Sequence, residues 1–134
     1  MPAETPKQVL RQVIAAMDQG DWTIFDTHPG LYETRQHFPH LHAAFPDLRH
    51  TIETELAEGN LVACVATVRG THQGPFMGIA PTGKQVSFMV LWIDRVVDGT
   101  LVQHWAIPDF LNLFQQLGAT IQPPESRAVQ SSDR

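Results

Sequence analysis

Four long segments in the second half of the chain have the apolar and polar alternation of strands. They are residues 48–57, 61–71, 85–97 and 100–107. Glu58-Gly59-Asn60 and Asp98-Gly99 separate two successive pairs of them, and both turns supply residues that tolerate a positive φ. The pattern therefore predicts a four-stranded antiparallel meander. Strands of about ten residues coil strongly, so we expect the sheet to have one concave face.

Helical patterns flank these strands. Thr5-Pro6 is typical of a helix start, and one apolar stripe follows it. The stripe consists of Val9, Leu10, Val13, Ile14 and Met17. A short second helix is predicted over 22–25 and a last one over 110–117. Helices followed by a long-stranded sheet indicate an α+β fold, a curved antiparallel sheet packed on N-terminal helices with a cone-shaped pocket between them.

The size and charge of the chain narrow its class. We expect a single domain over residues 1–121, large enough to fold without disulfides or metal, and a loose polar tail over 122–134. The net charge is −5 and no basic run is present, which argues against a nucleic-acid partner. The N-terminal stretch has no continuous apolar run, so we predict neither a signal peptide nor a membrane span, and a cytoplasmic protein. The lone Cys64 lies in an apolar run and is expected to be a buried core thiol.

Histidines are concentrated between residues 37 and 50. His37 and His40 have a spacing that could bring two imidazoles together on a helix, but we expect Pro39 to break the helix between them. No cysteine or paired carboxylate completes a tetrahedral ligand set. The sequence therefore predicts no metal site, and these histidines are expected to be surface or hydrogen-bonding groups.

The last strand and the helix after it hold the two candidate catalytic residues, His104 and Asp109. Alternation places Val102, His104 and Ala106 on one strand face. The opposite face is predicted to hold Leu101, Gln103, Trp105 and Ile107. A neutral imidazole titrates where a general acid or base should, although a histidine can also be hydrogen-bonded in a polar core. Asp109 is the nearest acid, and its place after Pro108 also suits a helix N-cap.

Further candidates for substrate binding come from three regions. His72 begins a loop rich in glycine and proline that could close the pocket, or it could only anchor that loop. Phe88 and Trp92 could line an apolar pocket, although aromatic stripes are more often core packing. Asp26 and His28 are an ionisable pair after the short second helix, on the side that covers the pocket.

Several motifs resemble those of the SnoaL-like polyketide cyclases, and they occur in the same order. They are Ala44-Phe45-Pro46-Asp47-Leu48, Glu58-Gly59-Asn60, the loop segment 69–84, Asp98-Gly99, His104-Trp105, Asp109 and Gln115-Gln116-Leu117-Gly118. The resemblance covers residues 8 to about 119. It implies the NTF2-like cone fold, a homodimer with the sheets packed together, and a deep apolar pocket.

The resemblance also implies a chemistry. In these cyclases a polyketide methyl ester closes a ring by intramolecular aldol condensation, with no metal or cofactor. An acid/base aspartate directly follows the His-Trp motif, and a histidine on the preceding strand assists it. Here those positions hold Ala106 and Trp92, neither of which ionises, so the family's chemistry does not transfer residue by residue. Both become candidates to contact substrate.

Two functions are weighed at this stage, beside a third possibility, a purely dimeric scaffold whose cone is filled by its own side chains. The first is an enzyme that cyclises or isomerises a small apolar carbonyl or polyketide-like compound by cofactor-free acid/base chemistry. The second is a non-catalytic protein on the same fold that binds a small molecule, favoured by Ala106 and Trp92. In either case we expect a homodimer through the outer face of the sheet, because strands such as 85–97 are apolar on both sides.

Overall fold

The structure is a computed structural model that describes residues 3–120 and 122–124. The elements are α1 (Pro6–Asp18), the short 3-10 helices η1 (Trp22–Asp26) and η2 (Pro29–Leu31), α2 (Tyr32–Ala44), β1 (Arg49–Glu58), β2 (Leu61–Thr71), β3 (Gln85–Val97), β4 (Thr100–Pro108) and α3 (Phe110–Gln116). From residue 125 onward, the predicted tail lies outside the described residues.

The N-terminal helix has the start and the buried stripe that its sequence predicts. The Thr5 hydroxyl accepts from the Gln8 N–H at 3.2 Å, and the Gln8 side chain accepts from the Thr5 N–H at 2.8 Å. This reciprocal capping box satisfies two helix-end donors. The five predicted apolar residues of α1 are all buried, and α1 packs against all four strands.

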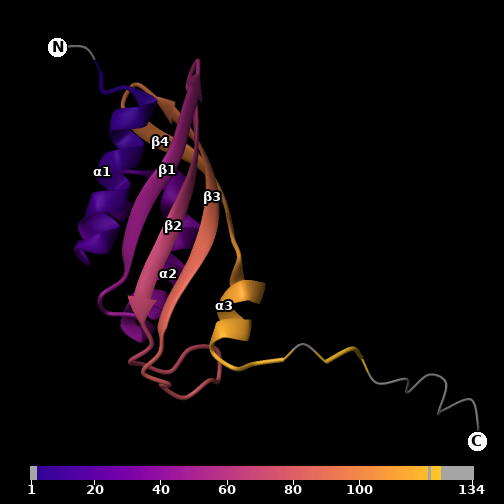
Figure 1. Ribbon diagram of the computed structural model, residues 1–134. Helices are drawn as coiled ribbons and strands as arrows, with labels where there is room; N and C mark the ends of the chain where they lie inside the picture. Colours follow the sequence, from indigo (N-terminus) through magenta and orange to yellow (C-terminus); the bar gives the residue numbers. More distant parts are fainter. Residues whose placement is uncertain (1–2, 121, 125–134) are drawn as a thin grey trace, which may run out of the picture.

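The four strands form one antiparallel sheet in the order β1-β2-β3-β4, as predicted. Gly59, Asp98 and Gly99 have the positive φ values that the two tight turns require. Figure 1 shows the long, curved strands with α1 and α2 along one side and α3 at the far end of β4. Burial alternates strictly along most of β3, so one face of the sheet carries the core and the other faces outward.

The second long helix corrects an expectation from the sequence. We predicted that Pro39 would break the helix between His37 and His40, but α2 runs through it without interruption. An internal proline costs about 3 kcal/mol because it removes a backbone hydrogen bond. Phe38 and Ala44 are buried on either side of Pro39, and the packing of this helix against the core offsets that cost.

A β-bulge in β4 corrects a second expectation. Val96 pairs with Leu101 and Arg95 pairs with Gln103, so Val102 is an extra residue in the ladder. Simple alternation placed Leu101 on the same face as Trp105. Because of the bulge, Leu101 lies instead on the buried face of the sheet. A Cβ on Gly30 would lie only 2.6 to 2.7 Å from atoms of Leu101, Val102 and Gln103, so η2 can approach the bulge this closely only with glycine there.

The outward face of the sheet is strongly apolar. Its exposed apolar residues on the two last strands are Met89, Leu91, Ile93, Val97, Trp105 and Ile107. Four of them are neighbours, because Leu91 pairs with Ile107 and Ile93 pairs with Trp105. In the described part of the chain, no helix has the length and apolar character needed to cross a membrane.

Candidate functional site

A cavity of about 1150 Å³ lies between α2 and the concave face of the sheet. Aromatic and aliphatic side chains make most of its wall: Phe38, Leu41, Val68, Phe76, Phe88, Val90, Trp92 and Phe110. The ionisable groups of its lining are Tyr32, Glu33, His37, His40, His50 and His104. An apolar cavity with a few polar groups is the usual form of a small-molecule site.

His104 enters this cavity from β4 with a buried carboxylate behind it. Asp94 is its cross-strand partner on β3, and Asp94 Oδ1 lies 2.5 Å from His104 Nδ1. The Asp94 side chain is fully buried, and that of His104 is 7% exposed. An ionised carboxylate only accepts, so the Nδ1–H of His104 donates to it, and in a neutral ring the lone pair then lies on Nε2.

The Nε2 atom of His104 is free to meet a ligand. Within the described residues it has no hydrogen-bond partner, and it is accessible to solvent. The His104 ring stands edge-on to Trp92, with ring centroids 5.1 Å apart. A neutral imidazole oriented by a carboxylate, with Nε2 open to an apolar cavity, is the arrangement of a general base.

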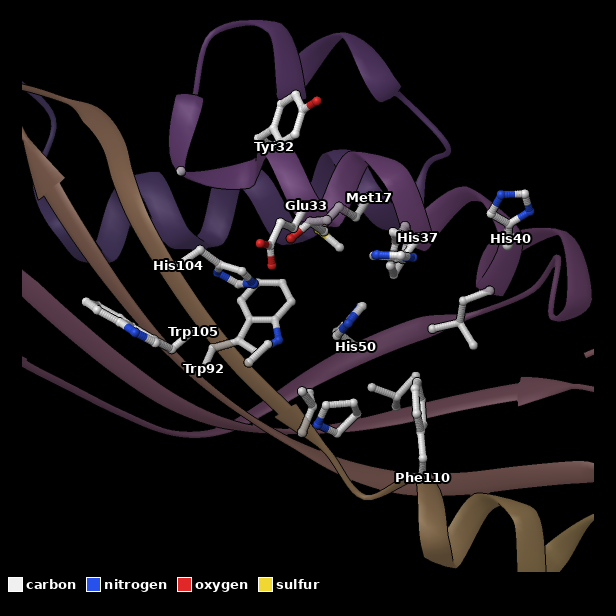
Figure 2. Close-up of a pocket in the computed structure, with 18 of the residues that line it drawn as sticks. Met17, Tyr32, Glu33, His37, His40, His50, Trp92, His104, Trp105 and Phe110 are labelled. Atoms are coloured by element: carbon white, nitrogen blue, oxygen red, sulfur yellow. The ribbon is translucent and has the colours of Figure 1, made fainter. Parts of the chain in front are cut away.

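A second histidine of the cavity lining, His50, is also paired with a carboxylate. His50 stands at the start of β1, and its Nδ1 lies 2.6 Å from Oδ1 of Asp18 at the end of α1. The backbone N–H of His50 also donates to Asp18 Oδ2 at 2.9 Å. The His50 ring lies 5.5 Å from that of Trp92, so the indole has an imidazole on two sides (Figure 2).

Of the eight residues singled out in the sequence, the structure brings four to the cavity: His104, Trp92, Phe88 and Ala106. Asp109 is exposed and lies outside the lining, where its carboxylate accepts from the Asn112 N–H at 3.1 Å and caps α3. The geometry thus favours the capping alternative for Asp109. Asp26 also lies outside the lining, and it forms an exposed ion pair with Arg35.

The two remaining candidates are buried, away from the cavity lining. His72 Nδ1 accepts from the Thr82 N–H at 3.1 Å, and its ring stacks on Phe45, which favours the alternative that His72 anchors the loop. His28 Nδ1 accepts from the Leu101 N–H at 3.0 Å, at the bulge of β4. His28 therefore ties the segment between η1 and η2 to β4.

The burial of His28 makes the stability of the protein depend on pH. Burial lowers the pKa of His28 below its usual 6.5, and the nearby Glu4 and Asp94 carboxylates oppose this only in part. The unfolded chain binds this proton first, so the stabilising contribution is complete above pH 6.5 and is lost as the pH falls below 6.5 toward the folded-state pKa. Protonation at Nδ1 also removes the acceptor for Leu101.

We expect His28→Asn to lose less stability on acidification than the wild-type protein, because the amide oxygen can accept from Leu101 but does not titrate. Urea unfolding of both proteins at pH of about 7.5 and about 5 measures this difference. The other histidines are present in both proteins and cancel in the comparison. An equal loss in the two proteins would show that His28 is not the responsible group.

Apart from His104, sequence analysis assigned none of the ionisable groups of the cavity lining to the site, and it did not find Asp94 behind His104. For Asp94 a signal existed, since it falls on the buried face of a strand that is otherwise apolar there. The expected break at Pro39 concealed that α2 would carry Glu33 and His37 along the cavity. Figure 2 shows the Glu33 carboxylate directed toward His104, whereas the Tyr32 ring points away. Among the described residues, no three His, Cys, Asp or Glu side chains are grouped as metal ligands.

Comparisons with known proteins identify relatives that are named as cyclases. The aklanonic acid methyl ester cyclase DnrD of Streptomyces peucetius is 34% identical over 83 residues, which are 61% of this chain and 57% of the relative. The nogalonic acid methyl ester cyclase of Streptomyces nogalater is 31% identical over 77 residues, 57% of this chain and 58% of the relative. The chain thus matches less than three fifths of the length of these cyclases.

A solved structure with a similar fold covers more of the chain. AclR, a candidate hydroxylase from Streptomyces galilaeus, matches with a TM-score of 0.80 and 29% identity, over 96% of this chain and 90% of AclR. The NTF2-like cone fold expected from the sequence is thereby confirmed. The family model for SnoaL-like polyketide cyclases matches residues 8–117, nearly the whole described domain. The chain belongs to the SnoaL-like polyketide cyclase family.

Proposed function

We propose that this protein closes a ring in a flat, polyketide-like carbonyl compound by cofactor-free acid/base chemistry, with His104 as the base. The observation that carries the proposal is the Asp94–His104 pair, whose Nε2 is open to an apolar cavity. A non-catalytic binding protein needs such a cavity too. It has no need of a buried carboxylate that fixes the tautomer of a cavity histidine.

The Asp94–His104 pair lies next to the two positions at which the family's ionisable residues are replaced here. The resemblance assigns the acid/base aspartate to position 106 and its histidine to position 92, which here are Ala106 and Trp92. Those two residues are cross-strand partners, and the next pair on the same face toward the hairpin is Asp94 and His104. The proposal is that the aspartate-histidine pair of the family is shifted by two residues along the β3–β4 ladder. In this chain the aspartate is on β3 and the histidine is on β4, the reverse of the family's arrangement.

The chemistry follows from the orientation of His104. Its Nε2 removes a proton from the carbon beside a carbonyl group, and the C–H electron pair becomes an enolate. The enolate carbon then attacks a second carbonyl carbon of the same molecule. Asp94 holds the ring and stabilises the imidazolium that forms. The Glu33 carboxylate, directed toward His104 from α2, adds a further negative charge on that side (Figure 2).

The cavity also suits the proposed class of substrate. Its volume of about 1150 Å³ exceeds what a single small ring fills, since pockets for drug-sized ligands measure roughly 300–1,000 Å³. Phe88, Trp92 and Phe110 offer aromatic faces on which fused rings can stack. A multi-ring aromatic ester therefore fits this wall better than a small polar metabolite.

The test uses aklanonic acid methyl ester, because that compound is in the name of a relative. Intramolecular aldol addition leaves the molecular formula unchanged, so substrate and product have the same mass. Liquid chromatography must therefore separate them. Catalysis predicts product formation at a rate proportional to protein concentration. Tight binding that quenches tryptophan fluorescence without any product would instead establish the non-catalytic alternative.

The proposal includes a homodimer through the outward face of the sheet. Leu91 and Ile93 are 49% and 45% exposed in the middle of an apolar strand face, and Trp105 and Ile107 extend that face on β4. Contiguous apolar surface of this kind is typical of an interface. A two-fold axis through it would bury the same residues of both subunits.

We expect Leu91→Glu to convert the dimer to a monomer of 15.0 kDa, because each dimer would bury two unpaired carboxylates. Sedimentation at micromolar concentration measures the mass. Tyr32→Glu is the control, since Tyr32 is also an exposed apolar side chain, 70% exposed, but lies on α2, away from that face. A wild-type protein that sediments as a monomer would refute the dimer.

A further inference from the structure

Trp92 lies between two histidine-carboxylate pairs. In the first, Asp94 of β3 supports His104 of β4, and in the second, Asp18 of α1 supports His50 of β1. Both histidines present Nδ1 to a carboxylate at hydrogen-bond distance, and both line the cavity. The proposed function uses only the first pair.

The second pair has an open ring nitrogen as well. The His50 side chain is only 3% exposed. Within the described residues its Nε2 makes no hydrogen bond, and this atom is still accessible to solvent. The hydrogen bond from the backbone N–H of His50 to Asp18 Oδ2 already links α1 to β1. That link does not require the imidazole to end in the cavity beside Trp92.

We infer that His50 is a second catalytic residue, the acid that protonates the oxygen released as an alkoxide in ring closure, with Asp18 as its positioning residue. The inference rests on the proposed function and extends it by assigning the two proton transfers to two different histidines. Its substrate class is a polycyclic compound stacked over Trp92 whose two reacting carbons lie within bonding reach of each other. The acidic C–H is directed toward His104, and the oxygen of the accepting carbonyl is directed toward His50.

The proton balance of the step is complete. Neutral His104 takes the proton from the α-carbon, and the new enolate carbon bonds to the second carbonyl carbon. The π electrons of that carbonyl move to its oxygen, and protonated His50 gives its Nε2 proton to this alkoxide. Substrate and product are isomers. Afterwards His104 releases a proton to water and His50 takes one up, which restores the starting state without an oxidant or reductant.

The first test separates proton removal from ring closure. In heavy water, with aklanonic acid methyl ester, we expect His50→Asn to lower product formation by about two to four orders of magnitude and still exchange the α-hydrogen of the substrate for deuterium. The asparagine keeps an N–H near the position of Nδ1 for Asp18 but has no group at Nε2.

The control is His42→Asn, the same change at a histidine that packs on Trp22 outside the cavity lining. We expect its turnover to match the wild-type rate. If His50→Asn keeps the turnover of His42→Asn, the inference is overturned and the Asp18–His50 pair is structural. If His50→Asn loses deuterium exchange together with product, His50 is not a separate acid, which also overturns it.

The second test needs neither turnover nor a variant. Chrysazin, a planar dihydroxyanthraquinone, is titrated into the wild-type protein while NMR follows the ring nitrogens. We expect the Nε2 resonances of both His50 and His104 to shift on binding, and those of His42 to stay unchanged. A response of His104 alone overturns this inference and leaves the proposed function intact. No response at either ring, with chrysazin bound elsewhere, overturns both.

Discussion

Replacing His104 with asparagine is expected to lower kcat/KM for ring closure by about two to four orders of magnitude, the usual contribution of a general base. An asparagine amide can still donate to Asp94 from near the position of Nδ1, so the buried carboxylate keeps a partner. The group that is lost is Nε2, the only part of His104 that the proposed mechanism uses as a base. Initial rates with aklanonic acid methyl ester, measured by chromatography, give the ratio.

Asp109→Asn tests the other candidate for the catalytic group. Its carboxylate caps α3 outside the cavity lining, and asparagine caps a helix as well as aspartate does. We therefore expect both turnover and the melting temperature to stay close to wild type. Full activity of His104→Asn, or a large loss in Asp109→Asn alone, would move the chemistry away from β4.

Asp94→Asn is expected to lower turnover by a similar factor, about two to four orders of magnitude, while His104 itself stays in place. The asparagine can present its NH₂ group to Nδ1, which turns His104 into the tautomer with its hydrogen on Nε2 and leaves no lone pair for the substrate. The imidazolium that forms in the reaction would also lose the negative charge beside it. Both effects act on catalysis more than on substrate binding.

The measurement that distinguishes this effect from unfolding is the division between kcat and KM, together with a thermal melt. We expect kcat to fall with little change in KM, and the protein to remain folded at the assay temperature. The double variant with His104→Asn should be hardly slower than either single variant, since both changes disable one unit. Additive losses in the double variant would show that Asp94 and His104 act independently.

The sequence by itself determined most of the architecture, because the signals involved are local. The apolar stripe of α1, its Thr5 cap and the turns at Gly59 and Asp98 depend on residues a few positions apart, and each appears in the structure as predicted. The meander followed from these turns, since a tight turn leaves two strands little choice but to pair with each other. The motifs of the resemblance likewise led to the correct family and fold.

The tertiary structure alone decided what the site contains. Asp18 and His50 are 32 residues apart in the chain and meet only because α1 packs across the sheet. Pro39 opposes a helix locally, yet the burial of Phe38 and Ala44 keeps α2 whole and carries His37 along the cavity. The bulge at Val102 removed Leu101 from the face that period-two counting gave it. Long-range packing can outweigh a local preference of a few kcal/mol, and a pattern of neighbouring residues contains no record of that packing.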